Sequence, residues 1–184
     1  MRTFIGIRIS EEIKKNFLEI TGKLSSKTKE ARIVPPENLH ITLKFLGNVE
    51  TSCLANIKDI LSNICGEFEP FDMQVKGLGV FPEQKQLRVL WIGVKSNGYL
   101  KSLNRKIEEE FEKLGFPNEK RFKEHITISR FRSLPNLSVI NNLMDRFSEH
   151  SFGVMNVEGV ELIESVLTSS SPPVYKTLFH CPFL

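Results

Sequence analysis

"NLHITLKFLG" (residues 38–47) shares the tripeptide His-Ile-Thr with "HITISRF" (125–131). The chain of 184 residues has four histidines, and two of them, His40 and His125, stand in this identical setting. The two tripeptides lie 125 − 40 = 85 positions apart. A motif that returns at such a distance is typical of an internally duplicated chain, and the rest of the sequence can be read at the same offset.

Two further pairs of segments repeat at nearly this offset. "TFIGIRI" (3–9) and "RVLWIGV" (88–94) are rich in β-branched and aromatic residues, predict strands, and begin 88 − 3 = 85 positions apart. "QVKGL" (74–78) resembles "NVEGV" (156–160), at an offset of 156 − 74 = 82. We therefore expect one bilobal domain over 1–184 that arose by internal duplication, with the approximate repeat units 3–81 and 88–164.

Each repeat unit has the order strand, helix, strand, helix, strand. In "SEEIKKNFLEITGKL" (10–24) apolar residues recur at helical spacing behind Ser10, a plausible N-cap, and 97–115 carries a similar stripe that ends at Gly115. The other predicted elements are helices over 51–68 and 136–150, closing strands over 71–81 and 152–164, and a C-terminal strand over 173–182. The expected fold class is α+β, with two pseudo-twofold-related lobes and the active-site cleft between them; each lobe is a mainly antiparallel sheet with helices on its outer face.

The composition is ordinary for a soluble globular protein, with 40% hydrophobic and 26% charged residues. A net charge of +3 permits an anionic partner without demanding one. The odd number of cysteines, three, argues against a disulfide framework and favours a cytoplasmic location. Neither a signal peptide nor a membrane-spanning apolar run is recognisable, so no membrane partner is expected.

Alternation along a strand places His and Thr of each tripeptide on one face. His40 and Thr42 point one way while Ile41 points into the core, and His125 and Thr127 repeat the arrangement. One such strand would be an ordinary half-buried strand. Two of them related by duplication can face each other and line a cleft with two imidazoles and two hydroxyls.

This set of groups suits a phosphodiester. Histidine exchanges a proton near neutral pH, so that of two imidazoles flanking a phosphorus one can act as base and the other as acid. Threonine hydroxyls can donate hydrogen bonds to the non-bridging oxygens without adding a charge. No cofactor is required. A metal site built on the two histidines is an unfavoured alternative, because neither tripeptide has a carboxylate or cysteine at a suitable offset.

"HITL" (40–43) and "HITI" (125–128) match the paired HxTx motifs of the 2H phosphoesterase superfamily. Together with "RTFIGIRI" (2–9), "PPENLHITLKFLGNV" (35–49) and "ESVLTSSSPPVYKTL" (164–178), they make the whole chain resemble the RNA 2′,3′-cyclic phosphodiesterase family, also called 2′-5′ RNA ligase. The resemblance implies hydrolysis of 2′,3′-cyclic phosphate ends of RNA to 2′-phosphate ends. It also implies a reversible, ATP-independent 2′-5′ joining of RNA, with tRNA halves as possible substrates, by a protein that we expect to be a monomer.

The resemblance also assigns roles to residues. His40 would be the proton donor to the leaving 3′ oxygen and His125 the proton acceptor that activates water. Thr42 and Thr127 would bind the phosphate. The family's arginine after the second motif corresponds to Arg130 and its late tyrosine to Tyr175, both as substrate-binding residues.

Two positions complicate this assignment. Glu124 stands where the family often has proline, and an acid there could raise the pKa of His125 unless strand alternation turns it away, as we expect. Arg130 has the same parity as Ile126, so that a regular strand would aim it away from the cleft. A strand end or a bulge would return it.

Residues outside the motifs allow weaker predictions. Two basic clusters beside the tripeptides are either solvated loops or contacts to an RNA backbone: Lys23, Lys27, Lys29 and Arg32, and Lys120, Arg121, Lys123, Arg130 and Arg132. Phe81 is a candidate for base stacking, whereas His150 and His180 are expected to be structural. Two alternatives stay open: 2′-5′ ligation as the main activity, and a non-catalytic module that binds RNA ends.

Overall fold

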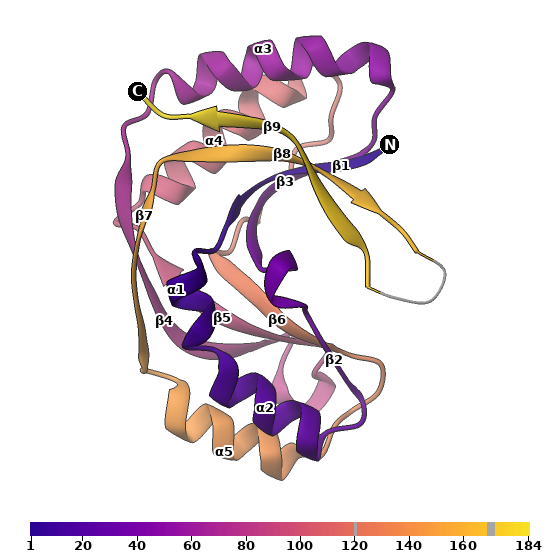
Figure 1. The fold of residues 1–184 in the computed structure, drawn as a ribbon, viewed down its shortest axis with the longest axis vertical. Coiled ribbons are helices and arrows are strands. Elements are labelled where there is room, and N and C mark those ends of the chain that lie inside the picture. Colours follow the sequence, from indigo (N-terminus) through magenta and orange to yellow (C-terminus); the bar gives the residue numbers. More distant parts are fainter. Residues whose placement is uncertain (120, 169–171) are drawn as a thin grey trace.

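Two antiparallel sheets form the frame of the molecule in the computed structural model, which describes residues 1–119, 121–168 and 172–184. Sheet A has the strand order β3-β1-β8-β9, formed by His40–Asn48, Arg2–Arg8, Gly159–Val166 and Val174–Pro182. Sheet B has the order β2-β6-β5-β4-β7, formed by Ala31–Ile33, His125–Phe131, Val89–Lys95, Phe71–Phe81 and Ser151–Val157. The two sheets and their helices confirm the predicted α+β fold with two lobes (Figure 1).

The two sheets do not coincide with the two sequence repeats. Strands β1 and β3 of the first repeat lie in sheet A, but its closing strand β4 pairs with β5 in sheet B. In the same way β8, from the second repeat, pairs with β1 in sheet A. Each sheet therefore contains strands from both repeats, which ties the lobes together. The duplication itself stays a prediction.

Helices cover the outer faces of the sheets and are exchanged in the same manner (Figure 1). The helices α3 (Leu54–Cys65) and α4 (Tyr99–Glu112) lie over sheet A, and α1 (Glu11–Lys15), α2 (Leu18–Lys27) and α5 (Leu137–Phe147) lie against sheet B. Short 3₁₀ turns, η1 (Pro36–Asn38), η2 (Thr51–Cys53) and η3 (Gln84–Gln86), complete the described elements. The apolar side of each long helix is buried, as the spacing of its residues predicts.

The prediction of a single helix over 10–24 is wrong in one respect, because two helices, α1 and α2, form in its place. Ser10 caps α1 as expected. At the break the amides of Asn16 and Phe17 donate three residues back, to the carbonyls of Ile13 and Lys14. The amide of the Asn16 side chain donates to the carbonyl of Phe152 on β7, at 2.7 Å, so a tertiary contact fixes the bend.

The single strand predicted over 152–164 is also wrong, since Glu158 divides it into β7 and β8. The two parts belong to different sheets, and the chain crosses from one lobe to the other at this residue. Strand β2 was not predicted either: part of the first basic loop pairs with β6, with Arg32 opposite Arg130. Periodicity could not reveal these features, because both depend on which sheet edge is available.

No helix in the described part of the chain is long and apolar enough to cross a membrane.

Candidate active site

The two strands that begin with His-Ile-Thr, β3 and β6, contact each other where the two sheets meet. Their first seven residues have the same burial pattern, and Ile41 and Ile126 are both completely buried. His40, Thr42, His125 and Thr127 are half-buried on the opposite face. The alternation predicted for both tripeptides is therefore present.

A β-bulge follows each tripeptide at the same position. In sheet A, Gly6 of β1 lies opposite Thr42, and the residue before it, Ile5, lies opposite Lys44. Leu43, between Thr42 and Lys44, therefore has no opposing residue. In sheet B, Ile128 is passed over in the same way, between Thr127 and Ser129. A bulge reverses the alternation beyond it.

The bulge decides where Arg130 lies. Ile128 and Ser129 are both buried, and the next residue, Arg130, is exposed on the face of His125 and Thr127. The bulge thus resolves the parity problem that a regular strand would pose. In β3 the corresponding residue is Phe45, which is 50% exposed and was not identified from the sequence. The offset of 130 − 45 = 85 was the signal that could have found it.

One cavity of about 410 Å³ collects these side chains. Its lining includes all six residues to which the family resemblance assigns a role: His40, Thr42, His125, Thr127, Arg130 and Tyr175. The other lining residues are Arg2, Thr3, Phe4, Val34, Phe45, Gly47, Ser165, Leu167 and Pro173. Both histidines of the tripeptides, both of their threonines and two arginines, Arg2 and Arg130, therefore share a space of the size of a small ligand.

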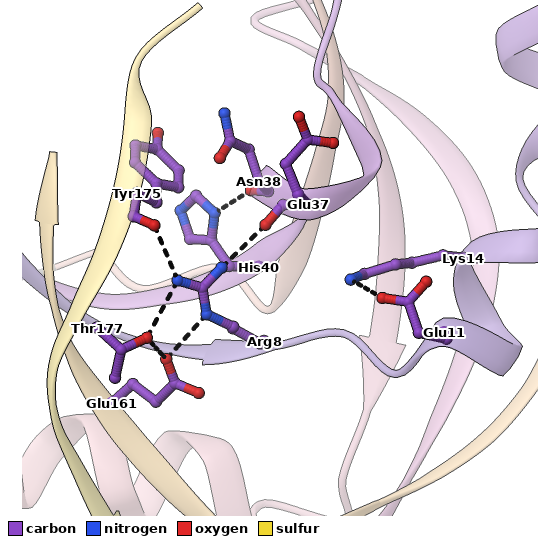
Figure 2. A network of polar contacts seen from close by, with 9 residues as sticks. All are labelled: Arg8, Glu11, Lys14, Glu37, Asn38, His40, Glu161, Tyr175 and Thr177. Carbon is purple, nitrogen blue, oxygen red and sulfur yellow. Dashed lines mark hydrogen bonds and ion pairs between the residues drawn. The ribbon is translucent and has the colours of Figure 1, made fainter. Parts of the chain in front are cut away.

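His40 is held on three sides. Its Nδ1 lies 2.6 Å from the carbonyl oxygen of Asn38, and its Nε2 lies 3.0 Å from the hydroxyl of Thr42. Its ring packs against Phe4 and against the edge of Tyr175, with centroids 4.7 Å and 5.2 Å away. Figure 2 shows Tyr175, Asn38 and His40 side by side.

His125 repeats the backbone contact in other surroundings. Its Nδ1 lies 2.6 Å from the carbonyl oxygen of Lys123, again two residues earlier in the chain. Its ring meets Phe81 and Trp91 edge-on, with centroids at 5.1 Å and 6.3 Å. The ammonium group of Lys123 lies over both of these rings, 4.7 Å and 4.3 Å from their centroids.

The shared backbone contact selects one tautomer of both histidines. A carbonyl oxygen can only accept a hydrogen bond, so Nδ1 must carry a proton in each ring. In the neutral imidazole Nε2 then carries the lone pair, and at His40 the hydroxyl of Thr42 donates to it. Each Nε2 is thereby the atom that can exchange a proton with a ligand.

Burial lowers the pKa of both histidines. For His40 it lowers the pKa to about 4; the hydrogen bond to Asn38 opposes this, and the charges of Arg8, Arg130 and His125 act in the same direction as burial. Burial also lowers the pKa of His125, against the bond to the Lys123 carbonyl and with help from the charge of Arg130. The free site is therefore suited to an anion, which would offset these positive charges.

Glu124 is turned away from His125, as expected. Its carboxylate accepts a hydrogen bond from the hydroxyl of Ser96, at 2.8 Å, and faces Lys101. The acid at this position accordingly does not raise the pKa of the neighbouring histidine.

The residue after each bulge points to the helix side of its sheet. Lys44 is almost completely buried there, paired with Glu108 of α4, and donates to the carbonyl of Pro117 at 2.8 Å. The amide of Asn104 donates to the carbonyl of Leu43 at 2.8 Å. These contacts attach the bulge of β3 to α4. At the corresponding place in β6, the hydroxyl of Ser129 donates to the carbonyl of Arg32.

The remaining selected residues lie around the cavity or away from it. Arg32, Arg121, Lys123 and Arg132 are exposed near β6, Lys27 is exposed at the end of α2, and Lys29 is exposed in the loop that follows, whereas Lys120 lies outside the described residues. Phe81 packs on His125 instead of lining the cavity. His150 packs against Phe147 and Phe152, and His180 is exposed on β9; neither lines the cavity. RNA contacts by the basic residues stay a prediction.

Among the residues that the structure describes, no three His, Cys, Asp or Glu side chains come together as a metal site would require.

Comparisons with known proteins identify the family to which the chain is related. The family model described as LigT-like phosphoesterase matches the chain twice, over residues 7–91 and 92–174. The chain is 38% identical to an RNA 2′,3′-cyclic phosphodiesterase of Archaeoglobus fulgidus, over 97% of this chain and 98% of that protein. It is 35% identical to the protein of the same name from Thermotoga maritima, over 100% of this chain and 96% of that one.

Solved structures show the same fold. TT0787 of Thermus thermophilus superposes with a TM-score of 0.84 at 27% identity, covering 100% of this chain and 98% of that one. Escherichia coli LigT, solved with 3′-AMP, superposes with a TM-score of 0.73 at 21% identity, over 99% and 97% of the two chains.

Proposed function

Because the chain belongs to the LigT-like phosphoesterase family, we propose that it hydrolyses 2′,3′-cyclic phosphate ends of RNA to 2′-phosphate ends. The observation that carries the proposal is the convergence of two histidines in one cavity, each with its Nδ1 bonded to a backbone carbonyl. Relatives that share 32% to 38% of its residues over nearly the whole chain carry the name of this activity.

The reaction needs one base and one acid. Nε2 of His125 accepts a proton from water as the water oxygen forms a bond to phosphorus. The bond between phosphorus and the 3′ oxygen breaks, and Nε2 of His40 donates a proton to that oxygen. The products are a 2′-phosphate and a 3′-hydroxyl. Each proton transfer contributes roughly 10²- to 10⁴-fold to the rate.

The acid role requires a protonated His40, although its pKa is about 4 in the free protein. A phosphodiester anion beside Nε2 favours the imidazolium, and the hydrogen bond from Nδ1 to Asn38 favours it as well. Substrate binding would therefore raise the pKa of His40 towards neutrality. The hydroxyl of Thr42 would turn from Nε2 to a non-bridging oxygen of the phosphate.

Arg130 and the threonines complete the anion site. The guanidinium group of Arg130 stands on the same face as His125 and can bind two phosphate oxygens at once. Thr42 and Thr127 approach from opposite strands. These donors stabilise the additional negative charge of the transition state, and this stabilisation requires no metal.

Ligation and its reversal use the same groups. If the 5′-hydroxyl of a second RNA replaces water, His125 remains the base and His40 the acid; the two histidines exchange these roles when the 2′-5′ bond of a joined RNA is cleaved back to the cyclic phosphate. Ligation of tRNA halves is therefore an activity of the same site. The rate of ligation relative to hydrolysis depends on whether water or an RNA end occupies the attacking position.

An oligonucleotide with a 2′,3′-cyclic phosphate end tests the proposal. We expect a 2′-phosphate product, unchanged turnover in the presence of a strong chelator, and joined product only when a 5′-hydroxyl oligonucleotide is added. A 3′-phosphate product would contradict the assigned leaving oxygen. RNA binding without turnover would support the non-catalytic alternative.

A further inference from the structure

Arg8 of β1 lies opposite His40 in the ladder between β1 and β3. Its guanidinium group does not enter the cavity. Instead it reaches the two segments that flank His40: Nη1 donates to the carbonyl of Glu37 in η1 at 2.9 Å, and Nη2 donates to the carbonyl of Tyr175 in β9 at 3.3 Å (Figure 2).

The guanidinium group is itself held from behind. Its Nε donates to Glu161 of β8 at 2.9 Å, and its Nη2 also contacts the hydroxyl of Thr177 at 3.2 Å. That hydroxyl donates to the same carboxylate oxygen of Glu161, at 2.7 Å. Figure 2 shows these groups as one connected network. The guanidinium group thus makes four hydrogen bonds through all three of its nitrogens, a geometry that lysine cannot reproduce.

The two segments that Arg8 joins are those that define the His40 ring. The turn η1 ends at Asn38, whose carbonyl accepts the Nδ1 proton of His40. The start of β9 presents Tyr175, whose ring packs on His40. The side-chain amide of Asn38 adds a second link between them, donating to the carbonyl of Pro173 at 2.7 Å.

In the other half of the site, a glycine occupies the position that corresponds to Arg8. Opposite His125 in the ladder of β5 and β6 lies Gly93. A Cβ atom there would lie 2.7 Å from the carbonyl oxygen of Lys76, so that no side chain fits without movement of the backbone. The arginine network is therefore specific to the His40 side.

We propose that Arg8 is a positioning residue for His40, which fixes η1 and the start of β9 around the imidazole through the carbonyls of Glu37 and Tyr175. The consequence for the reaction rests on the proposed function. If His40 must deliver a proton to one oxygen, its Nε2 needs a fixed direction. Misplacement of a catalytic group by about 1 Å can cost 10²-fold in rate.

Two substitutions separate geometry from charge. Arg8→Lys keeps the positive charge but loses the fork, and Arg8→Met loses both. Arg146→Met is the matched control, because Arg146 forms an ion pair with Glu19 on helices that cover sheet B, away from the cavity. We expect kcat on a cyclic-phosphate oligonucleotide to fall about 10- to 100-fold in both Arg8 variants, with little change in KM. Arg146→Met should retain wild-type kcat.

Nitrogen-detected NMR of His40 supplies a readout that is independent of turnover. The proton on Nδ1 should exchange slowly in the wild type and rapidly in both Arg8 variants. The charged groups that act on His40 are Arg8, Arg130 and His125. The pKa of His40 should accordingly rise in Arg8→Met and stay near the wild-type value in Arg8→Lys. Thermal unfolding of each variant verifies that it is folded under assay conditions.

Wild-type kcat together with a protected Nδ1 proton in Arg8→Lys would overturn the positioning role. An equal loss of kcat in Arg146→Met would also overturn it, since the effect would then be one of general stability. If the wild-type protein showed no turnover, the proposed function would fail, yet the Nδ1 proton in the Arg8 variants would still decide whether the network holds His40.

Discussion

The His40 and His125 halves of the site use one backbone design in two different surroundings. In both, a carbonyl two residues upstream binds Nδ1, and a bulge lies at the residue directly after the threonine, Leu43 in β3 and Ile128 in β6. Around His40 lie Phe4, Tyr175 and the arginine network, whereas His125 lies against Phe81 and Trp91, and the ammonium group of Lys123 lies over these two rings.

The two halves of the site share some features and differ in others. The shared features set the tautomer and the direction of each ring, which both partners of an acid–base pair require. The features that differ set burial and nearby charge, which decide the pKa of each ring. Under the proposed function, two similar strands thus supply two different proton-transfer groups.

Removal of either histidine is the strongest test of this comparison. We expect His40→Ala and His125→Ala each to lower kcat by about 10²- to 10⁴-fold, because each removes one proton transfer. RNA affinity, measured by fluorescence anisotropy, should change little. Wild-type kcat in one of the two variants would mean that only one half of the site is catalytic.

Substitutions of the residues directly after the two bulges, Lys44 and Ser129, should lower stability by different amounts. Lys44→Ala would leave Glu108 buried without its cation and lower the free energy of unfolding by about 3–5 kcal/mol. Ser129→Ala removes one hydrogen bond and should cost about 1 kcal/mol. Urea denaturation measures both, and the pair Lys44→Met with Glu108→Leu, which removes both charges, should recover most of the loss. Equal effects at the two positions would contradict the attachment of the β3 bulge to α4.

Arg130 and Phe45 occupy the same place after the bulge in the two halves. Arg130→Met should lower kcat/KM about 10- to 100-fold, since a hydrogen bond to a charged group contributes about 1.5–3 kcal/mol. Phe45→Ala should raise KM and leave kcat nearly unchanged, because this side chain carries no charge that could stabilise the transition state. Steady-state kinetics on one oligonucleotide compares them. A change in kcat/KM below threefold for Arg130→Met would place this arginine outside the phosphate site.

The pKa values predict a pH effect on stability from the His40 side. The pKa of His40 is about 4 in the folded protein and near 6.5 when unfolded, so the unfolded chain binds more protons between these values. Stability should therefore fall as the pH is lowered from 6.5 towards 4, by on the order of 2 kcal/mol from this residue. Between pH 7 and pH 4.5, the urea midpoint of the His40→Gln variant should fall by less than the midpoint of the wild type, because the variant lacks this contribution. The same decrease in the variant would mean that other groups cause it.

Much of the site could be predicted from local pattern alone. Alternation placed His40 with Thr42 and His125 with Thr127, and the repeated offset indicated that the two pairs belong together. Strand parity alone could not predict the position of Arg130, because it sends this residue to the wrong face; the family resemblance assigned Arg130 to the site. Only the bulge at Ile128 reverses that parity, and the sequence of β6 alone does not reveal whether an opposing strand skips a residue.

Phe45 and Arg8 escaped prediction for a related reason. An exposed phenylalanine in a strand resembles a core residue in the sequence, and an arginine at the end of β1 resembles a solvated charge. Their roles depend on partners far along the chain: Arg8 contacts Glu161 and Tyr175, more than 150 residues away.

The sequence by itself determined the periodic features: the amphipathic helices, the alternating strands, and the doubled tripeptide with its two imidazoles. Periodicity reports which residues seek the core, and this preference is local. The tertiary structure alone decided which strands share a sheet, where the ladders skip a residue, and which distant side chains surround each histidine. Those outcomes arise from competition for sheet edges and buried space across the whole chain, which no local pattern encodes.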